Sequence, residues 1–149
     1  MMSLREQIQE DMKAAMRARE TERLGTIRML LAAIKQREVD ERREQSDTDV
    51  LAVVEKLIKQ RKESARQFRD GGRPELADKE DAEIVFLQPY LPAALSEAEI
   101  DALIGSAISD SAAQGPRDMG KVLGLLRPQV QGRVDMAVLS EKVKTRLNT

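Results

Sequence analysis

QPYLPAALS, residues 88–96, is the stretch that sets how the helices of this chain are grouped. Its two prolines stand three positions apart, and a residue that precedes proline is disfavoured in the helical conformation. Ser96 then begins the pattern Ser-x-x-Glu with Glu99, a capping box that starts a new helix. We therefore expect a stiff joint here, with helices on either side of it.

Every periodic segment on both sides of the joint has a helical period. No run alternates with period two for long enough to indicate a strand. The group SDTD at 46–49 and Pro74 are helix starts, and Gly71-Gly72 is a helix stop. We expect an all-α protein, with an N-terminal four-helix unit over residues 1–92 and a small three-helix domain over residues 93–149.

The composition excludes several classes of catalytic site. The 149 residues include no Cys and no His, which removes thiol nucleophiles, serine–histidine catalysis and histidine-based metal sites. We expect no catalytic residues, no metal and no cofactor. No apolar run approaches the ~20 residues that span a bilayer, and MMSLREQIQEDMK at the N-terminus has no apolar signal segment. We expect a cytoplasmic protein without a membrane partner.

Charge is segregated along the chain, although the net charge is only −1. Residues 56–73 carry seven cations and two acids, and residues 75–83 carry five acids and one lysine. Four of the cations fall on one stripe of the third predicted helix, opposite its apolar seam: Lys59, Lys62, Arg66 and Arg69. This basic stripe is either a solvated face or a surface that follows a nucleic-acid backbone.

Arg61 differs from these cations because it falls within the apolar seam of the third helix. Glu80 and Glu83 fall on the seam of the fourth helix. In an antiparallel hairpin about Gly72, Arg61 precedes the turn by eleven residues and Glu83 follows it by eleven. A cation on a seam needs a partner, so we expect a structural ion pair between Arg61 and Glu83 or Glu80.

The stretch DMGKVLGLLRPQVQGRVD, residues 118–135, is unusually rich in glycine and proline for a helix. Gly120-Lys121 is not a phosphate loop, because Val122 follows the lysine and no strand precedes it. Gly120 and Gly124 lie on one side of the predicted helix. They allow either close packing inside the bundle or access of a ligand to the helical backbone.

Gly132 and Arg133 mark a turn just before Asp135, which caps the last helix. The first N–H groups of that helix are a natural anion site. Three cations surround the turn and make a candidate phosphate-facing edge: Lys121, Arg127 and Arg133.

The runs MGKVLGLLRPQVQGRVD (119–135) and VLSEKVKTRL (138–147) resemble the tail domain of GatB, the B subunit of the glutamine-dependent aspartyl/glutamyl-tRNA amidotransferase. Residues 56–100 resemble the free-standing YqeY family, and residues 23–40 are similar to its early helices. The resemblance implies a GatB/YqeY-type tail domain that contacts the outer corner of tRNA. It carries over these candidate tRNA-binding residues: Gly120, Lys121, Gly124, Arg127, Gly132 and Arg133.

Nothing in the chain matches the kinase and amidase regions of the amidotransferase, so any carbon–nitrogen ligase activity would be inherited from the family alone. The first interpretation is therefore a non-catalytic, tRNA-binding-like module whose partner is tRNA or another structured RNA. The alternatives are a protein-interaction adaptor, with a docking face on the first two helices, and an amidotransferase-like enzyme or an accessory to one.

Overall fold

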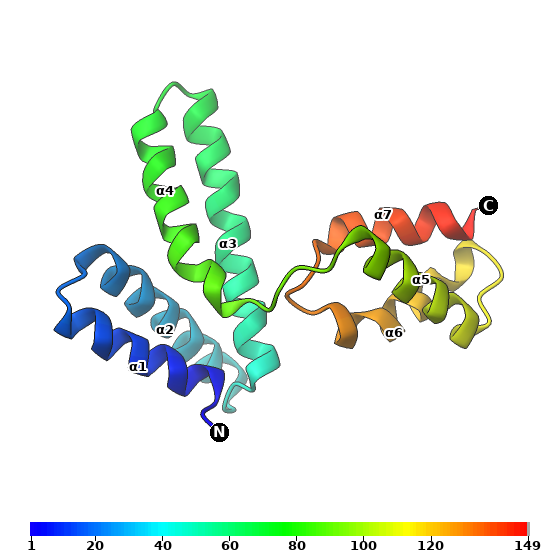
Figure 1. The fold of residues 1–149 in the computed structure, drawn as a ribbon, viewed down its shortest axis with the longest axis horizontal. Coiled ribbons are helices and arrows are strands. Elements are labelled where there is room, and N and C mark those ends of the chain that lie inside the picture. The colour runs from blue at the N-terminus through cyan, green and yellow to red at the C-terminus, as the bar shows by residue number, and fades with distance from the viewer. Residues whose placement is uncertain (149) are drawn as a thin grey trace. The chain divides into compact units, whose positions relative to one another are not determined.

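Residues 1–148 are described in a computed structural model, and every regular element among them is a helix (Figure 1). The predicted all-α class is confirmed. The chain forms two compact units, which divide between Leu91 and Pro92. Unit 1 contains α1 (Leu4–Arg17), α2 (Thr21–Glu41), α3 (Asp47–Asp70), α4 (Pro74–Leu87) and the 3-10 turn η1 (Gln88–Tyr90). Unit 2 contains α5 (Glu97–Ser111), the 3-10 turn η2 (Pro116–Asp118), α6 (Met119–Val130) and α7 (Met136–Leu147).

In unit 1, capping side chains start α1 and α3, and a pair of glycines ends α3. Ser3 Oγ accepts a hydrogen bond from Glu6 N at 3.1 Å at the start of α1. At the start of α3, the side chains of Ser46 and Asp49 form a reciprocal capping box. Gly71 ends α3, and Gly72 adopts a φ of +76°, which a residue with a Cβ rarely adopts.

Unit 1 consists of two helical hairpins, α1–α2 and α3–α4, that share one core (Figure 1). Helix α2 packs against both α3 and α4, and α1 packs against α2 and α3. The core is made of side chains that recur at helical spacing, which is why four amphipathic helices suffice to enclose it. Its largest fully buried members are Ile8, Ile27, Leu30, Ile34, Val50, Val54 and Leu87.

Tyr90 closes unit 1 at its C-terminal end. Its hydroxyl donates a hydrogen bond to Asp11 Oδ2 at 2.7 Å, so η1 is fastened to α1. Burial and the neighbouring carboxylate both raise the pKa of the Tyr90 hydroxyl, which remains a donor throughout the physiological range.

Unit 2 is a three-helix bundle with a core of its own. Ser96 and Glu99 form the capping box of α5, and Asp135 caps α7 by accepting from Ala137 N at 2.8 Å. The largest buried side chains come from all three helices: Ile104, Val122, Leu126, Val130 and Leu139. Across residues 1–148, none of the helices combines the length and the apolar character that crossing a bilayer requires.

Candidate nucleic-acid interface

The glycines of α6 lie on its solvent face. A Cβ built on Gly120 or on Gly124 would meet no atom within 4 Å, so neither glycine is used for close packing inside unit 2. The opposite side of α6 is buried through Val122, Leu126 and Val130. Of the two explanations for these glycines, close packing inside the bundle is therefore not the one that the structure shows, and the helical backbone is open to solvent at both positions.

Pro128 removes one backbone hydrogen bond from the same helix. Proline has no N–H, so the α-helical hydrogen bond that would end on the carbonyl four residues earlier cannot form. That carbonyl belongs to Gly124. Pro128 is itself exposed and lies inside α6. We call the exposed side of this helix the α6 face: Gly120, Lys121, Gly124, Leu125, Arg127 and Pro128.

Two cations flank the glycines on the α6 face. The side chain of Lys121 is 71% exposed and has only a long contact with Asp118, 3.6 Å from Nζ to Oδ1. Arg127 is exposed, and none of the ion pairs within residues 1–148 involves it. Leu125 is 43% exposed beside them. The arrangement offers positive charge around an open backbone.

Gly132 and Arg133 serve the turn between α6 and α7. Gly132 has a φ of +75°, the left-handed conformation that favours glycine. Arg133 Nε donates to the Ala93 carbonyl at 3.0 Å, and the Arg133 carbonyl accepts from Leu95 N at 3.0 Å. These bonds fasten the segment leading into α5 to the turn, so the guanidinium of Arg133 has a structural use.

The N-terminus of α7 is capped from within the chain. Asp135 places its own carboxylate on Ala137 N, where the sequence pattern had suggested an anion site. An external phosphate would have to displace that carboxylate. The candidate phosphate-facing edge is therefore best represented by Lys121 and Arg127.

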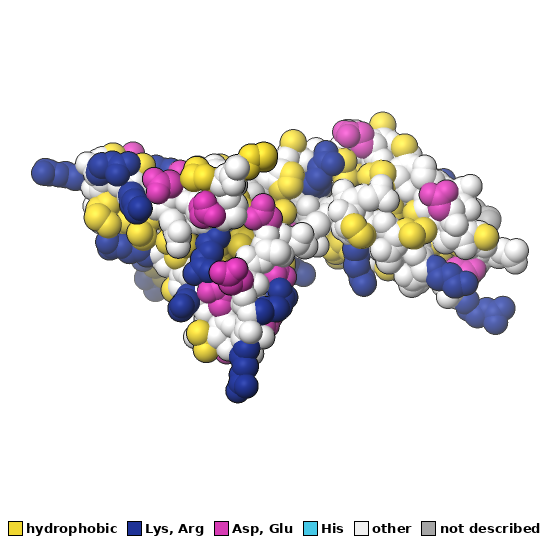
Figure 2. Space-filling model, turned by 90° about the horizontal axis from the view of Figure 1, so that it is seen from below, with side chains coloured by type: hydrophobic (Ala, Val, Ile, Leu, Met, Phe, Trp, Pro, Cys, Tyr) yellow, Lys and Arg dark blue, Asp and Glu magenta, His cyan; other side chains and the backbone are white. Residues whose placement is uncertain are grey.

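The basic stripe of α3 is partly neutralised. Arg66 contacts Glu63 and lies 3.2 Å from Asp70, both on its own helix. Arg69 contacts Asp81 and lies 3.5 Å from Asp78, both on α4. Lys59 and Lys62 remain exposed. On the face drawn in Figure 2, Lys and Arg side chains are likewise interspersed with Asp and Glu side chains.

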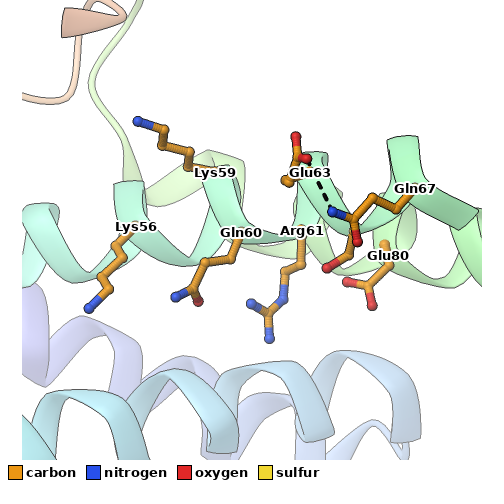
Figure 3. Close-up of a pocket in the computed structure, with 8 residues that line it drawn as sticks. Lys56, Lys59, Gln60, Arg61, Glu63, Gln67 and Glu80 are labelled. Carbon is orange, nitrogen blue, oxygen red and sulfur yellow. Dashed lines mark hydrogen bonds between the residues drawn. The ribbon is translucent and has the colours of Figure 1, made fainter. Parts of the chain in front are cut away.

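Beside this stripe is a polar groove of about 710 Å³ on α3 and α4 (Figure 3). Lys56, Gln60 and Arg61 point to one side of α3, and Lys59 points to the other. The groove is lined by polar and charged side chains: Lys56, Lys59, Gln60, Arg61, Glu63, Ser64, Gln67 and Glu80. None of these lining residues is an aliphatic or aromatic one.

Each nitrogen of the Arg61 guanidinium has a partner. Its Nε donates to Glu83 Oε2 at 2.9 Å, and its Nη1 donates to the Leu57 carbonyl at 3.2 Å. Its Nη2 contacts Met29 Sδ on α2. The structure thus brings Arg61 together with Glu83, whereas Glu80 lines the groove. Among the described residues, no group of three His, Cys, Asp or Glu side chains could hold a metal ion.

The model of the Yqey-like protein family matches residues 5–147, which is nearly the whole chain. The chain belongs to the YqeY-like family. This confirms the resemblance drawn from residues 23–40 and 56–100.

Curated relatives of this YqeY-like chain carry the name "Altered inheritance of mitochondria protein 41, mitochondrial". The protein of Pyrenophora tritici-repentis is 33% identical over 141 residues, which cover 92% of this chain and 77% of the relative. The Kluyveromyces lactis protein is 36% identical over 141 residues, 92% of this chain and 72% of the relative. The Lachancea thermotolerans protein is 37% identical over 113 residues, 73% of this chain and 60% of the relative.

These names overturn one expectation. From the composition and the N-terminal sequence we expected a cytoplasmic protein, whereas the relatives are named as mitochondrial. The absence of Cys is compatible with many compartments, so it could not decide the location.

Pro128 of this YqeY-like chain was not among the residues predicted to contact RNA. The signal was present, because a proline four residues after Gly124 inside one helix frees the carbonyl of that glycine. That this carbonyl belongs to an exposed part of α6 is known only from the structure, in which Gly124 and Pro128 are both exposed.

Proposed function

We propose that this YqeY-like protein is a non-catalytic module, related to the amidotransferase B-subunit tail, that binds tRNA or another structured RNA through the α6 face. The observation that carries the proposal is that Gly120 and Gly124 open onto solvent between two exposed cations. The resemblance of residues 119–135 to the amidotransferase tail, which contacts tRNA, points to the same face.

The α6 face is costly for the stability of unit 2. Glycine in a helix interior costs about 1 kcal/mol relative to alanine, and proline costs about 3 kcal/mol. No packing contact at a Gly120 or Gly124 Cβ position compensates, because nothing lies within 4 Å. A binding role gives a physical reason for keeping such residues on an exposed helix.

The chemistry of the α6 face suits RNA. Proteins that read the shape of RNA contact its phosphates and its 2′-hydroxyl groups. Lys121 and Arg127 supply cations for phosphates, and the Gly124 carbonyl can accept a hydrogen bond from a 2′-hydroxyl. Without side chains at Gly120 and Gly124, an RNA backbone can approach the helix closely.

The first test is fluorescence anisotropy of labelled tRNA titrated with the full chain at several salt concentrations. We expect log K to fall with log salt, and the double variant Lys121→Ala/Arg127→Ala to lower the magnitude of that slope by about two. The matched control is Lys13→Ala/Lys35→Ala, which removes the same charge from unit 1 and should leave tRNA binding unchanged. Equal loss in both double variants would show non-specific attraction and reject the α6 face.

A second test separates binding from stability. Gly124→Ala should raise the free energy of unfolding by up to about 1 kcal/mol, because alanine favours helix and meets no neighbour. Gly120→Ala should raise it less, because Gly120 is in the first turn of α6. Both should weaken tRNA binding, since the added methyl group occupies the approach path. Gly25→Ala is the control, because Gly25 is also a helical glycine with nothing within 4 Å. Stabilised variants that bind tRNA as tightly as the native chain would contradict the proposal.

A further inference from the structure

A second surface lies in unit 1, between the outer sides of α1 and α2. It is a groove of about 560 Å³, which we call the α1–α2 groove, lined by Arg5, Gln9, Met12, Lys13, Leu31, Ala32 and Lys35. Met12 and Leu31 form its floor, where they are partly buried and pack against the core of unit 1. The groove therefore has an apolar floor with cations around it.

The cations of the groove are only partly neutralised. Arg5 contacts Glu38, whose side chain is 12% exposed, and Lys13 Nζ lies 3.4 Å from Glu10 at the exposed surface. Lys35 is exposed and takes part in none of the ion pairs within the described residues. The same is true of Arg28, two turns earlier on the same side of α2. A ligand that binds in the α1–α2 groove would therefore be complementary in charge if it carried acidic groups.

Exposed apolar side chains also lie on both helices, beyond the residues that line the groove. Met16 follows Met12 by one turn of α1 and is 47% exposed, and Val39 follows Lys35 by one turn of α2 and is 60% exposed. From Arg5 to Met16 the surface runs for about 16 Å, at 1.5 Å per residue. That length matches three turns of another helix.

We infer that the α1–α2 groove binds an acidic amphipathic helix of a partner protein. Such a helix places apolar residues at i, i+3, i+4 and i+7 into an apolar groove, and its flanking carboxylates reach cations on the rim. The recessed floor fits a convex helix better than a planar bilayer. The aromatic residues that anchor proteins at membrane interfaces are also absent from the residues that line the groove. This inference does not depend on RNA binding, because it concerns the other unit.

The probe is a synthetic helical peptide of about 16 residues, with one stripe of leucine flanked on both sides by glutamate. A second peptide keeps the leucines and replaces every glutamate with lysine. We expect the full chain to bind the acidic peptide at least about tenfold more tightly than the basic peptide, as measured by anisotropy. Amide shifts in the NMR spectrum should concentrate on α1 and α2. Equal affinity for the two peptides, or shifts confined to other helices, would overturn the inference.

Charge reversal at the rim provides the matched comparison. Lys13→Glu/Lys35→Glu should weaken binding of the acidic peptide by about tenfold or more, and both positions are exposed enough to keep the fold. Lys56→Glu/Lys59→Glu makes the same charge change on α3 and should bind normally. No loss in the first variant, or equal loss in both, would reject the groove as the site.

Three further outcomes would contradict this assignment. The chain binding vesicles of phosphatidylcholine and phosphatidylserine but not the acidic peptide would identify a membrane surface. Self-association that Lys13→Glu/Lys35→Glu abolishes would identify a second copy as the occupant. Loss of peptide binding in Lys121→Ala/Arg127→Ala would place the peptide on α6, whereas retained binding there keeps this inference separate from the RNA proposal.

Discussion

At the scale of single residues, the carboxylate of Asp49 stabilises the start of α3. It accepts hydrogen bonds from Ser46 N at 2.9 Å and from Ser46 Oγ at 3.0 Å. Arg43 donates to it through Nη1 at 2.7 Å and Nη2 at 3.1 Å. These donors, the Arg43 guanidinium first among them, hold the pKa of Asp49 well below its ordinary value of 3.8.

Replacing Asp49 with asparagine should lower the free energy of unfolding by about 1 kcal/mol at pH 7, because the neutral amide loses the ion pair with Arg43 and weakens the capping box with Ser46. Because the folded-state pKa is lowered, the carboxylate stabilises the fold above its unfolded pKa, near 3.8. This stabilisation is lost as the pH falls through the folded pKa.

Urea unfolding at pH 7 and at several values below pH 4 checks this, and the gap between native chain and variant should narrow with acid. Asp110→Asn, at an exposed position on α5, is the control. An equal free energy of unfolding for the native chain and Asp49→Asn at pH 7 would refute the assignment.

At the scale of elements, the outer part of the α3–α4 hairpin is held together by small residues and ion pairs. Between residues 59 and 83, the buried positions are Ala65 and Ala77, which allow the two helices to approach closely. The large buried side chains end at Ile58 on α3 and begin again at Leu87 on α4. The pairing of Arg61 with Glu83 lies in the interval between them.

Arg61→Leu should lower the free energy of unfolding by about 1–3 kcal/mol, because it leaves the half-buried Glu83 carboxylate without its cation. The side chains of Arg61 and Glu83 are only 13% and 26% exposed, so solvent screens the pair weakly. The double variant Arg61→Leu/Glu83→Leu should recover most of the loss, since two apolar side chains need no partner.

A double-mutant cycle by urea unfolding measures this coupling. The pair Arg66 and Glu63, with side chains 61% and 54% exposed, is the matched control and should show a much smaller coupling, because solvent screens it. Equal coupling in the two pairs would mean that burial does not strengthen the Arg61 pair.

At the scale of the whole molecule, each unit has a hydrophobic core composed of its own residues. We expect each to unfold in its own cooperative step. The core of unit 2 is drawn from three short helices, and small domains bury a smaller share of their surface. Unit 2 is therefore expected to unfold first.

Leu126→Ala should lower the stability of unit 2 by about 2–5 kcal/mol, because Leu126 is fully buried in its core. Hydrogen exchange of individual amides, followed by NMR, reports the two units separately. Amides of α6 and α7 should lose protection, and those of α3 should keep it. The matched change Leu30→Ala in unit 1 should show the opposite pattern. Loss of protection in both units from either change would show a single cooperative unit.

The helices themselves could be predicted from the sequence because they depend on local properties: apolar spacing, capping residues, glycine and proline. A partner for Arg61 at Glu83 or Glu80 followed from the same reasoning, since equal distances from Gly72 indicate which residues of a hairpin face each other, and the structure pairs Arg61 with Glu83. These features need only the geometry of one helix or one turn. They were therefore accessible before the fold was known.

Only the tertiary structure decided which side of α6 is buried and which cations are left without an ion pair inside the protein. Gly120 and Gly124 fit a packing face and an exposed face equally well in sequence, and the buried side was chosen by competition among Val122, Leu126 and the helices around them. Arg69 is neutralised by acids on α4, and Arg133 binds the carbonyl of Ala93, forty residues away. Such contacts depend on the folded arrangement of distant segments. The sequence gives the charge of each side chain, but only the fold determines which distant residue lies next to it.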